Sequence, residues 1–393
     1  MLRKTPPLAP APSIGPACLQ DTALPGRRRL VILAAGGSMA LASTQSPAQR
    51  NPASRAQPSA ADPAAGIGTP QEDWIEFRRR YLLPEGRVVD TGNRNVSHSE
   101  GQGYAMLAAV RADDQGSFGR LLGWTLANLK RREDNLCSWR FQPDQQPNVT
   151  DPNNATDGDL FIAWALLEAG ARWGNADYRR RAIAIARDLL RSCTSQRNGR
   201  WVLLPGAYGF QGRTRTVLNL SYYAFPAMRA LGREVADPVW GRLEEDGLTL
   251  LRQARFGRFG LPPDWLELRA NADLLPADGW PARFSFDAVR IPLNMVWAGL
   301  ADHPSVNAAV GFWADPDHRA IPAWTDLRSG QLAPYPAHSG IVAVARLSTA
   351  AILARGDASV MPRIGGAPDY YAAALTLLSR MAWRDLQLSP AMR

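Results

Sequence analysis

The chain has 393 residues, of which 46% are hydrophobic, and a formal net charge of +9 at pH 7. This length and apolar content indicate a globular protein that can bury a large core, in one large domain or in two. The basic residues form no cluster with interleaved aromatic side chains, and short runs such as FRRRY and YRRRA are typical of a solvated helix face. Nucleic acid is therefore not an expected partner.

Residues 1–42 have the pattern of an export signal. Three arginines precede the apolar stretch from Leu30 to Ala42, which ends in the small-residue pattern ALA. The stretch is shorter than the roughly 18 to 20 residues that a membrane span requires, so we expect a signal peptide and no span in the mature chain. The arginines also permit twin-arginine export, which leaves the route open. The segment carries five Lys or Arg and one acid, so its removal lowers the net charge from +9 to +5.

Residues 43–69 are rich in Pro, Ala and Ser and contain almost no large apolar side chain. Such a segment cannot order itself by burial, and we interpret it as a flexible linker. Helical patterns then recur over 71–82, 99–112, 116–131, 157–173, 177–194, 219–233, 238–255, 286–300, 306–314, 339–354 and 368–384. Strand patterns are confined to short pieces such as RWVLLPG.

The predicted helices alternate between two kinds. Segments such as DLFIAWALLEAGARW are apolar nearly all round, whereas segments such as DYRRRAIAIARDLLRS have one charged face. This alternation predicts two concentric layers of helices, with the apolar helices inside, in a single all-α domain over residues 70–393. A helical solenoid is the competing architecture, but the sequence contains no repeat of fixed length.

The segment SHSEGQGYAM, residues 97–106, places Glu100 beside two glycines at the start of a predicted helix. Gly101 and Gly103 together cost roughly 2 kcal/mol relative to alanine, so their position needs a reason. They either allow tight packing against a neighbouring helix, with a serine capping the helix, or let a ligand approach the backbone next to Glu100. A single carboxylate does not make a catalytic mechanism, so further catalytic groups must come from other parts of the sequence.

Two further segments place acids at the start of an apolar helix. In NATDGDLF, Thr156 is a plausible N-cap, and Asp157 and Asp159 occupy the first turn, where helix-dipole stabilisation alone can explain an acid. In FSFDAVRIPLN, Asp287 and Arg290 are three residues apart, a spacing that an ordinary ion pair also gives. If these helices form the inner layer and run in the same sense, the three acids meet at one rim.

Aromatic side chains near these acids suit the flat faces of sugar rings, although each can equally belong to the core. They are Tyr104, Trp139, Tyr222, Tyr223 and Trp280. Two carboxylates on opposite sides of a sugar-binding groove are the minimum equipment for glycoside hydrolysis. The sequence has four histidines and no CxxC, which gives no metal signature, and it leaves Cys137 and Cys193 as either a disulfide or two buried thiols.

With these residues in view, the chain resembles the cellulases of glycoside hydrolase family 8, in particular the periplasmic endoglucanases that accompany bacterial cellulose synthases. The matching pieces are SEGQGYAM, TDGDLFIAWALLEAG, RWVLLPG, NLSYYAFPAM and FDAVRIPLNMVWAG, in the family's order over about residues 70 to 385. The resemblance implies an (α/α)6 barrel and inversion of anomeric configuration. One departure is Leu220, where related sequences often carry proline, which makes the backbone before Tyr222 and Tyr223 uncertain.

The resemblance also implies residue roles. Glu100 would be the general acid, Asp287 the general base, and Asp157 the residue that holds the sugar at the cleavage site. Tyr104, Trp139, Tyr222, Tyr223 and Arg290 are predicted to bind substrate. The implied activity is endo-1,4-β-glucanase on cellulose or a similar β-1,4-glucan, by a monomer without metal or other cofactor, with the cellulose synthase machinery as a candidate partner. Xylanase or chitosanase activity on the same fold, and a non-catalytic polysaccharide-binding role, are the alternatives.

Overall fold

The computed structural model describes residues 67–354 and 356–388. The expected signal peptide and most of the expected linker lie outside these residues. Within them the fold is mainly helical, with eleven α-helices, three short 3₁₀ turns and nine short strands. The helices are α1 (Pro70–Tyr81), α2 (Ser99–Arg111), α3 (Gln115–Asn128), α4 (Thr156–Trp173), α5 (Ala176–Ser192), α6 (Phe225–Glu234), α7 (Val239–Gln253), α8 (Arg290–Trp297), α9 (Pro304–Trp313), α10 (Ser339–Ile352) and α11 (Tyr370–Asp385).

Every predicted helix is present, but two are shorter than their patterns. The pattern over 219–233 divides into a 3₁₀ turn, η1 (Leu220–Tyr222), and helix α6, whose first turn contains a proline. Proline at this position needs no hydrogen-bonded amide, so the helix starts there. The pattern over 286–300 becomes the short helix α8, because residues 285–288 form a turn that precedes it.

The domain is mainly helical, as predicted, and short antiparallel strands occupy more of its loops than the one predicted strand piece. The strands are β1 (Ser97–His98), β2 (Arg140–Phe141), β3 (Thr194–Arg197), β4 (Arg200–Leu203), β5 (Arg215–Leu218), β6 (Leu266–Arg269), β7 (Leu274–Pro276), β8 (Arg283–Phe284) and β9 (Thr325–Asp326). They form the pairs β1–β2, β3–β4 and β8–β9 and the three-stranded sheet β5–β6–β7. Only β4, in RWVLLPG, gave a strand pattern.

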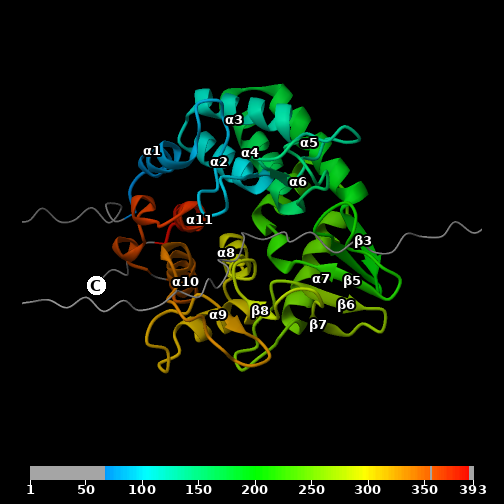
Figure 1. Cartoon of the computed structure of the whole chain (residues 1–393), viewed down its shortest axis with the longest axis vertical. Helices are drawn as coiled ribbons and strands as arrows, with labels where there is room; N and C mark the ends of the chain where they lie inside the picture. The colour runs from blue at the N-terminus through cyan, green and yellow to red at the C-terminus, as the bar shows by residue number, and fades with distance from the viewer. Residues whose placement is uncertain (1–66, 355, 389–393) are drawn as a thin grey trace, which may run out of the picture.

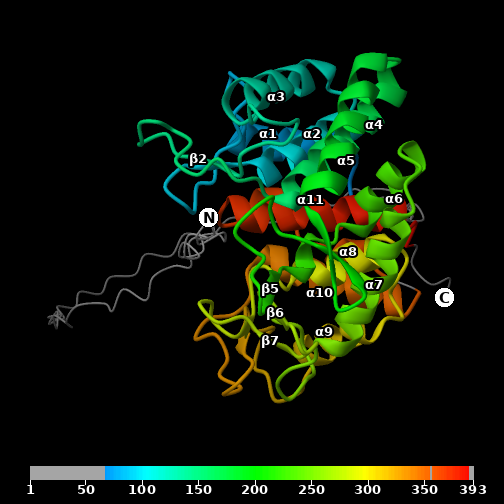
Figure 2. The same cartoon turned by 90° about the vertical axis from the view of Figure 1, so that its right-hand side faces the viewer.

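The helices follow one another around a closed path (Figure 1), from α1 in blue to α11 in red. Contacts run from α2 to α4, then to α6, α8, α10 and α11, and α11 returns to α2, so these six helices form a ring. Figure 2 shows α11 between α2 on one side and α8 and α10 on the other. Helices α1, α3, α5, α7 and α9 pack on the outside of the ring.

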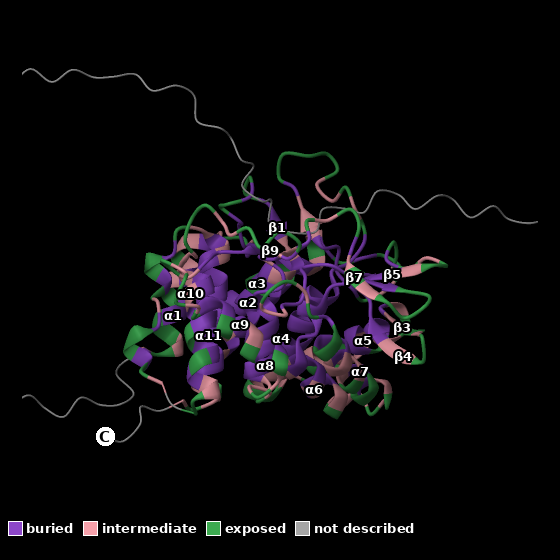
Figure 3. Cartoon of the chain, turned by 90° about the horizontal axis from the view of Figure 1, so that it is seen from below, coloured by how far each residue is buried: buried purple, intermediate pink, exposed green. Residues whose placement is uncertain are grey.

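Burial follows this arrangement, with the buried residues gathered in the centre (Figure 3). All residues of α2 from Gly101 to Val110 are buried, and so are those of α4 from Thr156 to Leu166. On the outer helix α5 only five of seventeen residues are buried. The two layers predicted from the alternation of apolar and charged helices are therefore confirmed for these helices.

The glycines of the SEGQG motif allow α2 to pack closely against its neighbours. A Cβ on Gly103 would lie 2.8 Å from the Cβ of Phe161 on α4, and one on Gly101 would lie 2.5 Å from the hydroxyl of Tyr370 on α11. A Cβ on Gly158 of α4 would lie 2.8 Å from the amide nitrogen of Glu100. The glycines thus serve helix packing, and no serine caps α2, whose N-cap residue is His98 without a side-chain hydrogen bond.

Residues 67–69, which precede the predicted boundary at residue 70, are packed against the domain. Ile67 is buried, Gly68 accepts a hydrogen bond from Arg384, and Thr69 forms a reciprocal capping box with Glu72 at the start of α1. These contacts fasten the first described residues to α11. No helix in the described ranges has the length and apolar character that would be needed to cross a membrane.

Candidate active site

One guanidinium joins the three predicted carboxyl groups. Arg290 Nη1 donates to Glu100 Oε1 at 2.5 Å and to Asp157 Oδ2 at 2.8 Å, and Nη2 donates to Asp287 Oδ1 at 2.5 Å. Nη1 also lies 3.2 Å from the hydroxyl of Tyr104. The carboxyl groups of Glu100 and Asp287 therefore face each other across the width of a single guanidinium. The structure brings together residues separated by up to 190 positions in the chain.

Each carboxyl group reaches this point because it stands at the start of a helix in the ring. Glu100 is in the first turn of α2, Asp157 is in the first turn of α4, and Asp287 lies three residues ahead of Arg290, the first residue of α8. The prediction that the three acids meet at one rim is confirmed. Thr156 does not cap α4 as expected, because its hydroxyl donates to the carbonyl of Leu204.

Of the two acids in the TDGD motif, only Asp157 belongs to the site. Asp159 is fully buried behind it, where it accepts hydrogen bonds from the amide of Cys137 at 2.8 Å and from the side chain of Asn154 at 3.0 Å. Asp159 therefore fixes the loop that leads from α3 to β2. The DxD motif therefore combines one carboxyl that contacts Arg290 with one structural carboxyl.

Three buried carboxyls around one cation cannot all be ionised at low cost. Burial and the charge of Glu100 raise the pKa of Asp157 well above its ordinary value. Burial also acts to raise the pKa of Glu100, but Arg290 and a hydrogen bond from Asp157 outweigh burial, so the pKa of Glu100 is lowered. The environment of Asp157 thus favours its protonated form, whereas Arg290 favours the charged form of Glu100.

Asp287 has a different environment. Burial raises its pKa to about 7, and the charges of Asp264 and Glu100 act in the same direction, while Arg290 opposes them. Its side chain is 8% exposed, against 19% for Glu100. Asp287 is therefore a carboxyl that changes its charge near neutral pH, which suits a general base.

A small cavity of about 40 Å³ lies next to these groups. It is far smaller than the roughly 300 to 1,000 Å³ of common ligand pockets and has room for water molecules only. A sugar ring must bind over its mouth or displace some of its lining. The lining residues are Asp90, His98, Glu100, Tyr104, Trp139, Tyr222, Phe286, Asp287, Arg290, Tyr370, Tyr371, Ala374 and Leu375.

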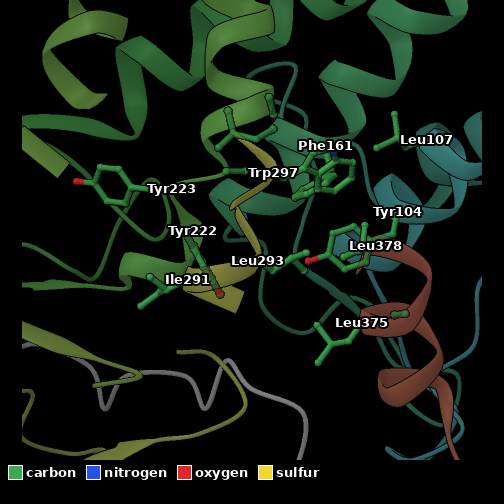
Figure 4. Close-up of a cluster of buried hydrophobic side chains, with 14 of the residues drawn as sticks. Tyr104, Leu107, Phe161, Tyr222, Tyr223, Ile291, Leu293, Trp297, Leu375 and Leu378 are labelled. Atoms are coloured by element: carbon green, nitrogen blue, oxygen red, sulfur yellow. The ribbon is translucent and has the colours of Figure 1, made fainter. Parts of the chain in front are cut away.

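Of the predicted aromatic residues, Tyr104, Trp139 and Tyr222 line the cavity and Tyr223 does not. Tyr223 is fully buried, and its hydroxyl accepts a hydrogen bond from the amide of Leu203 at 2.8 Å. Figure 4 shows this hydroxyl directed away from Tyr222 and Tyr104. Its position in the core corrects the expectation that both tyrosines of the SYY motif face the substrate, because adjacent residues at the end of a 3₁₀ turn point in different directions.

Trp280 lies outside the lining of the cavity. It stacks on Trp265, with ring centroids 4.9 Å apart, and the ring of Trp265 in turn lies 6.3 Å from the ring of Tyr222, centroid to centroid.

Leu220 fits the backbone at the start of η1 without proline. The side chain of Asn219 accepts hydrogen bonds from the amide and the hydroxyl of Ser221 and so caps this turn.

The ion pair between Asp287 and Arg290 that their spacing allowed is confirmed. The sequence did not predict that Arg290 also forms hydrogen bonds with Glu100 and Asp157, and its guanidinium lies 5.4 Å from the ring of Tyr222. Binding of substrate by Arg290 stays a prediction. The lining residues Asp90, His98, Phe286, Tyr370 and Tyr371 were also missed. His98 and Phe286 are direct neighbours of recognised motifs, whereas the two tyrosines of α11 gave no signal of their own.

Other candidate features of the sequence lie apart from this site. Cys137 and Cys193 are both buried and free, so they do not form the disulfide that was one of two expectations. Among the described residues, no group of three or more His, Cys, Asp or Glu side chains is arranged to hold a metal ion. A larger cavity of about 700 Å³, between α9, α10 and α11, is lined mostly by apolar side chains and contains none of the three carboxyls.

A mainly helical ring that brings three carboxyl groups together beside a small cavity contains the paired carboxyls that a glycoside hydrolase needs. The chain belongs to glycosyl hydrolases family 8, whose profile matches residues 55–385. It is 46% identical over 323 residues to a probable endoglucanase of Novacetimonas hansenii, covering 82% of this chain and 92% of that protein. It is 40% identical over 279 residues to an endoglucanase of Cellulomonas uda, covering 71% and 77%.

Solved structures agree with this assignment. The structure of an endo-β-1,4-glucanase from Acetobacter xylinum is similar with a TM-score of 0.76 and 44% sequence identity, and the match covers 82% of this chain and 99% of that one. An endoglucanase from Komagataeibacter sucrofermentans is similar with a TM-score of 0.75 and 41% identity, covering 80% and 97%. The resemblance seen in the motifs is confirmed over nearly the whole described region.

Proposed function

We propose that the protein is an inverting endo-1,4-β-glucanase that hydrolyses cellulose or a related β-1,4-glucan. The observation that carries the proposal is the hydrogen bonding of Glu100, Asp157 and Asp287 to the single guanidinium of Arg290. The similar proteins support the substrate class, because they are described as endoglucanases or endo-β-1,4-glucanases over most of this chain.

In the proposed mechanism Glu100 donates a proton to the oxygen of the departing sugar while Asp287 removes a proton from a water molecule on the opposite face of the ring. The water oxygen forms a bond to the anomeric carbon as the glycosidic bond breaks, which inverts the configuration. Asp157 holds a hydroxyl of the sugar at the cleavage site. The small cavity beside Asp287 has room for the attacking water.

Glu100 must be protonated to act as the acid, although Arg290 lowers its pKa in the unliganded site. We propose that the proton comes from Asp157, which shares a hydrogen bond with Glu100. A sugar that binds between the carboxyls competes for the contacts of Arg290. Glu100 then loses the interaction that favours its charged form, and the shared proton moves to it.

We also propose a barrel architecture, a cellular location and a partner for the protein. The ring of six helices with its outer layer corresponds to an (α/α)6 barrel, with the segment 357–366 in place of a sixth outer helix. Residues 1–42 direct export to the periplasm or the medium, and the linker predicted over residues 43–69 follows them. The mature protein acts as a monomer. The cellulose synthase machinery is its proposed partner, because an exported endoglucanase would meet the nascent glucan there.

Release of reducing sugar from carboxymethyl-cellulose, xylan and chitosan tests the proposal. We expect hydrolysis of carboxymethyl-cellulose above the other two. Glu100→Gln is expected to keep the melting temperature while lowering kcat by about 10²-fold or more, as loss of a general acid does. Preference for xylan or chitosan would replace the substrate assignment, and near-normal hydrolysis by the Gln variant would remove Glu100 from the mechanism. A parent protein that binds glucan without hydrolysing it would support the non-catalytic alternative.

A further inference from the structure

We propose that Asp264 is a positioning residue for the general base, because its buried carboxylate holds the turn 285–288 in the place from which Asp287 reaches Arg290 and the cavity. The proposal rests on the function proposed above. Asp264 lies in the loop before β6 and is 9% exposed. It is remote in the chain from every motif that the sequence identified.

The side-chain hydrogen bonds of Asp264 all go to one short turn. Its Oδ1 accepts from the amide of Ser285 at 2.9 Å and from the amide of Ala288 at 2.8 Å, and its Oδ2 accepts from the hydroxyl of Ser285. The backbone of Asp287 contributes a further hydrogen bond to the same carboxylate. Asp264 therefore holds Ser285 and Ala288, which lie on either side of Asp287 in the chain, and also the backbone of Asp287 itself.

Asp264 is itself well fixed. Its amide donates to the carbonyl of Arg283 at 2.8 Å, next to the strand pair β8–β9. From the other side of the turn, the hydroxyl of Tyr371 on α11 donates to the carbonyl of Phe286. The turn is thus held between a charged acceptor on the loop before β6 and a hydroxyl donor on a helix of the ring.

Stabilisation of the loop alone does not require a charge in this position. No ion pair to Asp264 is found among the described residues; burial raises the pKa of Asp264, and the hydrogen bonds from the turn oppose burial and favour its charged form. A buried unpaired carboxylate is costly, and a neutral side chain can accept hydrogen bonds from amides at lower cost. The charge has a use if it acts on Asp287, which lies one residue from the donor Ala288 and two residues from the donor Ser285.

Asp264 acts on Asp287 through its charge as well as through the position of the turn. Burial raises the pKa of Asp287 to about 7, Arg290 opposes burial, and Asp264 and Glu100 raise the pKa further. Asp157 on α4, Tyr222 in η1 and Tyr371 on α11 are the other titratable groups that interact with Asp287. Removing the charge of Asp264 leaves all of these in place and must lower the pKa of Asp287.

The test compares Asp264→Asn and Asp264→Ala with the parent protein on carboxymethyl-cellulose across pH. Asparagine keeps an oxygen for the amides of Ser285 and Ala288 but removes the charge. We expect a kcat within about tenfold of the parent and an acidic limb of kcat/KM that moves to lower pH by up to about one unit. Alanine also removes the hydrogen bonds to the turn. We therefore expect kcat to fall by about 10²-fold, with KM changed by less than about threefold.

Asp188→Asn is the matched control. Asp188 on the outer helix α5 is another buried carboxylate, 4% exposed, which accepts hydrogen bonds from the amide and side chain of Asn135 at 2.7 Å. Unlike Asp264 it also has an ion pair, with Arg191 at 2.8 Å, and it lies away from the carboxyls of the site. We expect it to lower the melting temperature and to leave the pH profile in place. If the alanine variant does not fold, Ser285→Ala replaces it, with a loss of kcat of less than about tenfold and no shift of the acidic limb, since the charge remains.

An acidic limb that stays in place in Asp264→Asn, or a kcat unchanged in Asp264→Ala, would overturn the positioning role and reduce Asp264 to a loop anchor. Failure of the proposed function gives a different result, because the parent protein would then release no sugar from carboxymethyl-cellulose at any pH. The two failures are therefore distinguishable in one set of assays.

Discussion

Arg290 decides the charge state of the site at the level of single residues. A lone guanidinium with hydrogen bonds to three buried carboxyls leaves an excess of negative charge unless one carboxyl keeps a proton. Asp157 is the most buried of the three, with a side chain 1% exposed, and its pKa is raised by burial and by the charge of Glu100. Asp157 is therefore the carboxyl whose environment most favours the protonated form, which is why we propose that it stores the proton for Glu100.

Asp157→Asn tests this storage of the proton. The variant cannot share a carboxyl proton and loses one charge-assisted hydrogen bond to the substrate, of roughly 1.5 to 3 kcal/mol, so kcat and kcat/KM should fall together by on the order of 10 to 10². The alkaline limb of kcat/KM should also move to lower pH, because Glu100 alone has a lowered pKa. An unchanged kcat with a lower melting temperature would mean that Asp157 only stabilises the start of α4.

The pH profile of the parent enzyme gives a second prediction at this scale. Asp287 must be ionised to act as a base, and its pKa is raised to about 7, so it is protonated below that pH and loses activity there. We expect kcat/KM of the parent to rise as the pH increases through about 7, well above the range of an ordinary aspartate. An acidic limb near pH 4 would contradict the burial of the base that the structure shows.

The residue roles show what the sequence could and could not predict. The sequence predicted the three acids of the site, Glu100, Asp157 and Asp287, because each precedes or begins an apolar helix. That position can be recognised from the order of residues alone. Tyr223 was placed wrongly, since the direction of a side chain after a 3₁₀ turn depends on its neighbours in space. Asp264 could not be found at all, because its partners lie 21 to 24 residues away and only the folded loop brings them together.

At the level of elements, close packing of α2 against α4 sets the position of Glu100 relative to Asp157. Gly103→Ala puts a Cβ 2.8 Å from the Cβ of Phe161 and 3.0 Å from the backbone nitrogen of Ile162. The helices must separate, and we expect the free energy of unfolding to fall by about 1 to 3 kcal/mol, with a loss of kcat as well, because the two carboxyls move apart.

Gly119→Ala in α3 is the control for this change, since no atom lies within 4 Å of the added Cβ. Alanine there should raise the free energy of unfolding by up to about 1 kcal/mol, as expected for a helical glycine, and leave kcat unchanged. Thermal or denaturant unfolding of both variants provides the measurement. Equal stability of the two variants would show that the glycine in the SEGQG motif does not serve helix packing.

The arrangement of the whole molecule follows from the same physical rule. Helices that are apolar all round must be covered on all sides, so they form the inner ring, and helices with one charged face cover them. This rule predicted the layers from the sequence. It did not predict the strands, because strands of two to four residues within long loops are too short to show an alternation of apolar and polar residues. It also did not predict the small size of the cavity, which depends on side chains from several segments of the ring.

The central claim, that Glu100 and Asp287 act on opposite faces of the sugar, is tested most directly by the configuration of the first product. Proton NMR during hydrolysis of a soluble cello-oligosaccharide distinguishes the two anomers before they interconvert. An acid and a base that act with a water molecule between them invert the configuration, and we predict that the α-anomer appears first. Initial appearance of the β-anomer would mean that a carboxylate attacks the sugar directly, and it would contradict the assignment of Asp287 as the general base.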